Sequence, residues 1–314
     1  MQLVPSMADR DGVIWKDGEM VDWRDAKIHV LTHTLHYGMG VFEGVRAYET
    51  HDGRTAIFRL DAHTERLLNS AKIFELDVPY DFATFNQAQK DVVRQNNLTS
   101  CYLRPLIWVG SEKLGISAKT NSIHAMVAAW HWGAYLGEEG MAKGIRVKTS
   151  SFTHHMPNVT MCKAKAVSNY PVSILANHEV TRNGYDEAIL MDPQGYVCQG
   201  SGENLFLVKN GELHTPDLAG GALDGITRRT IIQLASDLGI KVHERRITRD
   251  EFYIADEIFM TGTAAEVTPI REYDDRVIGK GARGELTTQL QSLFFDIVHG
   301  RNDKYAHWLT YVDE

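Results

Sequence analysis

Two lysines separated by a single residue, Lys163 and Lys165, are the side chains of this sequence best suited to covalent chemistry. They stand just before a predicted helix over 169–184, where Asn169 is the expected N-cap and Pro171 suits the first turn. A lysine held in a pocket at a strand–helix junction loses hydration, which lowers the pKa of its amine. The neutral amine can then attack a carbonyl carbon and form a Schiff base. Most lysines are instead solvated surface charges, and the two-residue spacing favours neither role.

Two arginines also occupy positions that allow two roles. Arg59 lies between a predicted strand over 55–60 and a helix that Asp61 is expected to cap. Arg104 interrupts an apolar strand predicted over 101–109. Either guanidinium could face solvent. However, the fork of an arginine suits a phosphate, and a cation inside an apolar strand needs a partner, such as an acidic group of a substrate.

The segment over 36–49, HYGMGVFEGVRAYE, combines glycines with aromatic and basic side chains. Gly38, Gly40 and Gly44 allow close backbone approach, but their spacing is not that of a dinucleotide-binding fingerprint. One interpretation is a turn that leads into a strand, and the other is the wall of a pocket. That wall would carry Tyr37, Phe42 and Arg46.

A helix predicted over 223–239 offers a place for a phosphate group, because Ile226 and Thr227 lie at its N-terminus. The free backbone N–H groups and the helix dipole make such an end attractive to an anion. The same helix has an ordinary apolar face, and the two roles use different surfaces. A literal G-x-G-x-x-G over 279–284 is followed by only 30 residues, too few for a dinucleotide-binding domain.

The composition argues against several classes of function. A net charge of −8 argues against a nucleic-acid surface, and no apolar run is long enough to span a membrane. The three cysteines are far apart and odd in number, which favours a reducing cytosol over a disulfide framework. The N-terminus lacks the basic start and apolar core of a signal peptide. The histidine pairs place no third ligand by spacing, so no metal site is expected.

Hairpins and helices are mixed along the chain, and a length of 314 residues predicts two α/β (α+β) domains. Further helices are predicted over 84–96 and 286–298, a loop over 111–120, and a glycine-rich linker near 133–140. The remaining strands and hairpins are predicted over 13–23, 123–130, 145–149, 187–192, 196–199, 257–260 and around the Asn210-Gly211 turn.

The lysine segment resembles the cofactor-lysine segment of the branched-chain amino acid aminotransferases, which use pyridoxal 5'-phosphate (PLP) and have the two-domain fold type IV. The resemblance rests on N-x-x-x-x-x-x-K-A-x-x-N-Y, formed by Asn158, Lys165, Ala166, Asn169 and Tyr170. It implies that Lys165 carries the Schiff base and that Lys163 is a neighbour. It also implies a small domain over 1–133, a linker over 134–140 and a larger domain over 141–314, with the cofactor between the domains.

Other segments resemble the same family, among them F-R-x-x-x-H-x-x-R-L, Y-x-R-P-L, G-S-G-E-N-L-F, L-x-G-I-T and T-G-T-A-A. They imply contacts to the cofactor phosphate, its ring and its phenolic oxygen, and a substrate pocket that holds a carboxylate. The cofactor-binding residues implied are Arg59, Lys165, Tyr170, Gln199, Leu223, Ile226, Thr227 and Thr263. The substrate-binding residues implied are Tyr37, Phe42, Gly44, Arg46, Tyr102, Arg104, Trp132, Ala264 and Ala265.

The resemblance implies transamination between L-leucine, L-isoleucine or L-valine and 2-oxoglutarate, in a cytoplasmic homodimer or higher oligomer. A loop over 111–117 would close the partner subunit's site. Gln199 departs from the family, which has glutamate there. Glutamine can hydrogen-bond the pyridine nitrogen but cannot supply the charge that keeps it protonated. The alternatives are another fold-type IV transaminase, for D-amino acids or (R)-amines, and a weakly active or inactive PLP-binding protein.

Overall fold

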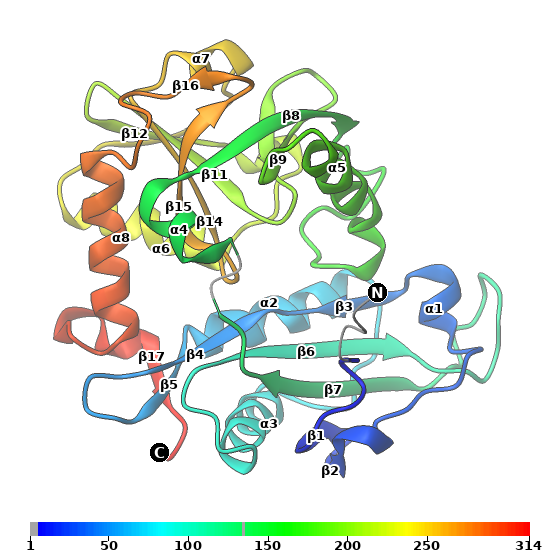
Figure 1. Cartoon of the computed structure of the whole chain (residues 1–314). Coiled ribbons are helices and arrows are strands. Elements are labelled where there is room, and N and C mark those ends of the chain that lie inside the picture. Colours follow the sequence, from blue (N-terminus) through cyan, green and yellow to red (C-terminus); the bar gives the residue numbers. More distant parts are fainter. Residues whose placement is uncertain (1–5, 134–135) are drawn as a thin grey trace. The chain divides into compact units, whose positions relative to one another are not determined.

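The computed structural model describes residues 6–133 and 136–314, and its contacts divide the chain into two compact units (Figure 1). The first unit contains the chain up to Trp132 together with Ala164–Ser168 and Val298–Glu314. The second contains Gly133–Lys163 and Asn169–Ile297. Two short segments therefore return to the first unit, and one of them carries Lys165.

The first unit is built on an antiparallel sheet with the strand order β17-β5-β4-β6-β7-β1-β2, in which β3 also pairs with β6. The β1–β2 turn at Asp17 and Gly18 has positive φ at both residues, as the predicted hairpin requires. The strands are β1 Val13–Lys16, β2 Glu19–Asp22, β3 Gly40–Phe42, β4 Val45–Glu49, β5 Thr55–Phe58, β6 Cys101–Val109, β7 Ile123–Trp130 and β17 Leu309–Tyr311.

Two helices of the first unit, α2 (Leu60–Ile73) and α3 (Phe82–Gln95), pack on one face of this sheet. Leu103 and Ile107 of β6 share their core with apolar residues of both helices. Because side chains alternate along a strand, Tyr102 and Arg104 project from the opposite face. The remaining short helices are η1 Trp23–Asp25, α1 His33–Tyr37 and η4 Asp303–Trp308.

The second unit contains a mixed sheet with the strand order β10-β9-β8-β15-β14-β11-β12-β13, to which β16 adds beside β15. The pairs β8–β9, β8–β15 and β12–β13 are parallel, and the others are antiparallel. The strands are β8 Ile145–Thr153, β9 Glu187–Met191, β10 Val197–Gly200, β11 Asn204–Lys209, β12 Glu212–Pro216, β13 Val242–Arg245, β14 Glu257–Gly262, β15 Glu266–Tyr273 and β16 Arg276–Val277. The helices are α4 Gly137–Lys143, η2 Val167–Asn169, α5 Pro171–Arg182, η3 Leu218–Gly220, α6 Ile226–Asp237, α7 Arg249–Tyr253 and α8 Glu285–Val298.

Two local predictions are wrong. The N-cap of α2 is Arg59, in the left-handed region, rather than Asp61, and the N-cap of α5 is Tyr170 rather than Asn169. Helix α4 occupies the end of the segment predicted as a linker, whose residues 134 and 135 lie outside the described residues. Within the described ranges, no helix is both long and apolar enough to cross a membrane.

Candidate active site

Lys165 is held by its backbone between a helix and a strand of the first unit. Its N–H donates to Ser70 Oγ on α2 at 3.0 Å, and its carbonyl oxygen accepts from the N–H of Phe42 at 3.0 Å. Its neighbour Ala166 forms a β-bridge with Val41. The Lys165 Nζ lies 5.0 Å from the centroid of the Phe42 ring. The lysine segment is thus fixed at both of its backbone groups, with the amine against an aromatic face.

Lys163 has a different environment, in the second unit. Its Nζ donates to the carbonyl oxygen of Leu218 at 3.0 Å, in the loop that leads to Leu223. Burial lowers the pKa of the Lys163 amine, and the nearby carboxylate of Asp224 opposes this shift. The contact gives Lys163 the role of a tether for that loop. The assignment of Lys165 as the reactive lysine stays a prediction.

The predicted substrate residues of β3, β4 and β6 form an aromatic and basic wall. Arg104 Nη2 donates to the Tyr102 hydroxyl at 3.3 Å, and its guanidinium carbon lies 4.8 Å from the Phe42 ring centroid. The Trp132 ring stands perpendicular to that of Tyr102, with centroids 4.6 Å apart. Arg46 pairs directly with Tyr102 across the sheet. The wall therefore offers a cation among aromatic rings, which suits an anionic group beside apolar ones.

Gly44 makes room within this wall, and Arg104 gives it a hydrogen-bond donor. A Cβ on Gly44 would lie 1.9 Å from the Tyr102 hydroxyl, so only glycine allows the tyrosine its position. The Nε of Arg104 is buried and has no hydrogen-bond partner among the described residues, which leaves a donor for an anion. Tyr37 lies in α1 rather than in the sheet, is half exposed and stacks on His33.

Arg59, the predicted phosphate ligand of the first unit, is fixed by the C-terminal segment. Its backbone has φ 54°, and its N–H donates to the carbonyl oxygen of Trp308 at 2.7 Å. The guanidinium carbon of Arg59 lies 4.8 Å from the Trp308 ring centroid. Trp308 was not predicted from the sequence, because it reaches Arg59 only through the pairing of Leu309 in β17 with Phe58 in β5.

The N-terminus of α6 provides a cradle in the second unit. Helix α6 begins at Ile226, and its N-cap, Gly225, supplies no side-chain hydrogen bond to the first N–H groups. A Cβ on Gly225 would lie 1.9 Å from Asn204 Oδ1, while Asn204 Nδ2 donates to the Leu223 carbonyl at 2.8 Å. Ile226 and Thr227 are buried. An uncapped helix start behind an obligatory glycine fits a phosphate group.

Gln199 is buried at the end of β10, and its orientation follows from its contact. The backbone N–H of Leu223 donates to its Oε1 at 3.0 Å. Because a backbone N–H can only donate, the oxygen must face Leu223, and the remaining end of the amide is the NH₂ group. Gln199 therefore presents a donor where a glutamate would present an acceptor.

The other predicted residues of the second unit lie at element ends. Thr263, Ala264 and Ala265 form the turn between β14 and β15, closed by Thr268, whose Oγ1 donates to the Ala265 carbonyl at 2.6 Å. The hydroxyl of Thr261, at the end of β14, is buried with no hydrogen-bond partner in the described parts of the chain. Tyr170 is half-buried at the start of α5. The unsatisfied hydroxyl of Thr261 is compatible with a polar ligand beside this turn.

In each unit, the types of side chain and backbone donor that are present fit a part of PLP. The second unit supplies a helix start at α6 without a side-chain cap and an amide beside Leu223 that can hydrogen-bond a ring nitrogen. The first unit supplies the constrained lysine and an arginine stacked on Trp308. Taken unit by unit, these groups are ones that suit a phosphorylated pyridine cofactor.

The chain is similar to known proteins over nearly its whole length. The model of the family described as Amino-transferase class IV matches residues 40–273. A branched-chain-amino-acid aminotransferase of Pseudomonas aeruginosa is 57% identical over 307 residues, which cover 98% of this chain and 99% of that protein.

Solved structures show the same likeness. The crystal structure of the Escherichia coli branched-chain amino acid aminotransferase matches with a TM-score of 0.94 and 45% identity, covering 96% of this chain and 100% of that one. The branched-chain amino acid aminotransferase of Thermobaculum terrenum, solved in its PLP form, matches with a TM-score of 0.90 and 34% identity, covering 96% of this chain and 98% of that one.

Proposed function

Since the chain belongs to the class IV aminotransferases and is a fold-type IV relative of the branched-chain-amino-acid aminotransferases, we propose that it transfers amino groups between branched-chain amino acids and 2-oxoglutarate. The products are branched-chain 2-oxo acids and L-glutamate. The observation that carries this proposal is Arg104, whose unsatisfied Nε lies among the rings of Phe42 and Tyr102. Such a wall accepts a carboxylate or an apolar side chain, which the two substrates require in turn.

PLP supplies the carbonyl carbon that accepts the amino group and a ring that takes up the electron pair of the broken C–H bond. Lys165 supplies the amine that holds the cofactor and then moves the proton between the substrate carbon and the cofactor carbon. Its backbone, fixed by Ser70 and Phe42, limits the positions that the amine can reach. This restraint is what proton transfer at a defined atom needs.

The phosphate group is assigned to Arg59, to the N-terminus of α6 at Ile226 and Thr227, and to Thr263. The supporting observation is the uncapped helix start at Gly225. Leu223 is assigned to the ring face, Gln199 to the ring nitrogen and Tyr170 to the phenolic oxygen.

The substrate is assigned to residues of both units. Arg104, hydrogen-bonded to Tyr102, pairs with the side-chain carboxylate of glutamate or 2-oxoglutarate. Phe42 and Trp132 meet the apolar side chain of leucine, isoleucine or valine, and Gly44 keeps the space that Tyr102 occupies. Ala264 and Ala265 receive the α-carboxylate at the β14–β15 turn, and Tyr37 and Arg46 line the rest.

Gln199 lowers the turnover that this site would otherwise reach. Its NH₂ group can donate to an unprotonated ring nitrogen but does not stabilise a protonated one. An unprotonated ring is a weaker electron sink, so breaking the substrate C–H bond becomes slower. We expect a PLP enzyme with the substrate preference of its relatives and reduced kcat.

The test is the visible spectrum of the PLP-loaded protein with L-leucine, D-alanine and an (R)-amine offered separately. L-leucine should bleach the visible band, and 2-oxoglutarate should restore it. Bleaching by D-alanine or by the (R)-amine but not by L-leucine would move the protein to another fold-type IV activity. A band that no amine bleaches would identify a PLP-binding protein without transamination.

The protein is proposed to act as a cytoplasmic homodimer or higher oligomer, with the loop over 111–117 reaching the partner's site. In that loop Ile116 is fully exposed and Leu114 is 47% exposed, and a partner subunit would give these apolar side chains a surface to contact. Sedimentation or light scattering tests the oligomer. We also propose the division into domains over 1–133 and 141–314, with a connection over 134–140 and with the C-terminal segment completing the sheet of the first unit.

A further inference from the structure

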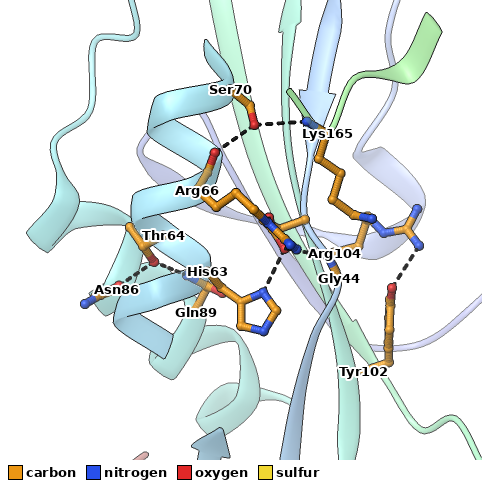
Figure 2. Close-up of polar contacts among 11 residues, drawn as sticks. Gly44, His63, Thr64, Arg66, Ser70, Asn86, Gln89, Tyr102, Arg104 and Lys165 are labelled. Atoms are coloured by element: carbon orange, nitrogen blue, oxygen red, sulfur yellow. Dashed lines mark hydrogen bonds and ion pairs between the residues drawn. The ribbon is translucent and has the colours of Figure 1, made fainter. Parts of the chain in front are cut away.

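A buried ionic cluster of Glu43, His63 and Arg66 lies in the first unit behind the lysine segment. The Glu43 carboxylate is fully buried and accepts from Arg66 Nε at 2.6 Å, from Arg66 Nη2 at 3.0 Å and from His63 Nδ1 at 2.7 Å. The N–H of Gly44 adds a fourth contact at 3.2 Å. Figure 2 shows His63 and Arg66 on the same helix, α2, with Ser70 one turn further along and Lys165 beside it.

The charges of this cluster follow from the balance between burial and the contacts among its members. Burial raises the pKa of the Glu43 carboxyl, but the charges and hydrogen bonds of Arg66 and His63 outweigh it, so the pKa lies well below its usual range. For His63, burial and the charges of Arg66 and Lys165 lower the pKa against the pull of Glu43. Glu43 is therefore ionised, His63 neutral and Arg66 charged, and the cluster has no net charge.

The cluster joins the two elements that hold Lys165. Glu43 follows Phe42, whose N–H binds the Lys165 carbonyl. Arg66 precedes Ser70 by one helical turn, and Ser70 Oγ donates to the Arg66 carbonyl at 2.7 Å while it accepts the Lys165 N–H. The ion pair between Glu43 and Arg66 thus links α2 to the end of β3. Glu43 is one residue from the Phe42 contact to the lysine, and Arg66 is one helical turn from the Ser70 contact.

We propose that the Glu43–Arg66–His63 cluster positions Lys165 by fixing the spacing between Ser70 and Phe42. These three residues touch neither substrate nor cofactor in the proposed function, on which this inference rests, so they are positioning residues. The Glu43 charge matters because it balances Arg66, whose helical turn carries the Ser70 contact to Lys165. Loss of the Glu43 charge would leave the buried Arg66 guanidinium without its carboxylate partner.

The main variant is Glu43→Gln, which keeps the size of the side chain and removes its charge. The matched control is Asp274→Asn in the second unit. Asp274 is a buried carboxylate that accepts from Arg249 at 2.6 Å and from the Tyr253 hydroxyl at 2.8 Å, and it contacts none of the residues predicted for the site. Glu43→Gln breaks a buried arginine–carboxylate pair, and Asp274→Asn breaks a pair in which the carboxylate is buried and the arginine is half exposed, so both should lower the melting temperature.

Three measurements separate positioning from stability. The first is the rate at which the apoenzyme captures added PLP, followed by the visible band. The second is the pH at which that band titrates, and the third is kcat and KM for L-leucine. In Glu43→Gln we expect slower capture, a titration moved to lower pH because a positive charge disfavours a cationic nitrogen, and kcat reduced about tenfold or more at similar KM. Asp274→Asn should retain the wild-type capture rate and titration.

A second variant keeps the proposal testable if Glu43→Gln fails to fold. Ser70→Ala removes the acceptor of the Lys165 N–H but leaves the ion cluster intact, and it should slow PLP capture and lower kcat. Its control is Thr181→Ala on α5, which removes a hydroxyl bonded to the carbonyl four residues earlier at 2.8 Å.

The proposal is overturned if Glu43→Gln and Asp274→Asn lose stability alike while capture and titration stay at wild-type values in both. It is also overturned if Ser70→Ala captures PLP as fast as Thr181→Ala. PLP capture needs no amino acid, so a failure of the substrate assignment would leave this result readable. A wild-type protein that does not capture PLP at all would remove both proposals.

Discussion

Replacing Gln199 by glutamate is expected to increase turnover. At present Gln199 Oε1 accepts the N–H of Leu223 at 3.0 Å, and the NH₂ group is the other end of the amide. A glutamate in the same conformation would keep the Leu223 contact with one oxygen. Its second oxygen would accept a hydrogen bond where the amide donates one, and it would favour a protonated ring nitrogen.

The size of the effect follows from the charge. An opposite charge within hydrogen-bonding distance shifts a pKa by about 1–3 units, which corresponds to roughly 1.4–4 kcal/mol in favour of the protonated ring. Burial of the new carboxylate opposes this gain, although the Leu223 N–H offsets part of that cost. If the barrier to C–H cleavage follows ring protonation only in part, kcat rises by about tenfold or more. KM should change little, because Gln199 is not assigned to the substrate.

The assay is steady-state transamination of L-leucine with 2-oxoglutarate by wild type and Gln199→Glu, each saturated with PLP. Gln194→Glu is the matched control, since it makes the same charge change five residues earlier at an exposed turn. Its kcat should equal that of wild type. An unchanged or lower kcat for Gln199→Glu, in a variant that still binds PLP, would refute the idea that the missing charge limits this enzyme.

Three further outcomes are expected. Gly44→Ala places a Cβ 1.9 Å from the Tyr102 hydroxyl, so KM for 2-oxoglutarate should rise, and adding Tyr102→Phe should partly reverse the rise; no reversal would contradict the clash. Trp308→Leu should weaken PLP binding in a spectral titration by loosening the stacked arginine, whereas Tyr311→Leu on the same segment should not. Burial lowers the pKa of His154 to about 4, below the unfolded value of about 6.5, so the unfolded state binds more protons between these values. His154 should therefore contribute a rise of about 3 kcal/mol in the free energy of unfolding from pH 4 to pH 6.5, measured by denaturant titrations, and a His154→Gln variant with the same slope would contradict this.

Elements set by their own apolar pattern were predictable from the sequence. The runs over 101–109 and 123–130 coincide with β6 and β7, because the sheet buries most positions of β6 and alternate or consecutive apolar positions of β7. Helix α8 begins within one residue of its predicted start. In these stretches the local preference and the burial in the fold agree, so the prediction needs no knowledge of distant residues.

Positions decided by distant contacts were not predictable in this way. The sequence offers Asp61 as a cap, yet Arg59 takes that place, with φ 54° and its N–H on the Trp308 carbonyl. Strand β17 brings this carbonyl to β5 by pairing. A cap chosen by propensity fails when a tertiary hydrogen bond holds another residue in the left-handed region.

In the site, three consecutive residues combine what the local pattern predicts with what only a distant contact decides. Alternation along an extended segment predicts that Phe42 and Gly44 face one side and that Glu43 faces the other. The sequence of residues 42–44 is enough for this prediction. The structure agrees with it, because Phe42 and Gly44 lie at the aromatic wall and Glu43 lies against α2. What the sequence does not reveal is that Arg66, 23 residues later, meets this carboxylate. A buried carboxylate without a cation strongly destabilises a fold. An inward-facing glutamate at position 43 therefore indicates that some cation of the chain must pair with it. Clusters of this kind can therefore be sought in a sequence. For each carboxylate that the alternation predicts to face inward, one looks for the cation that could pair with it.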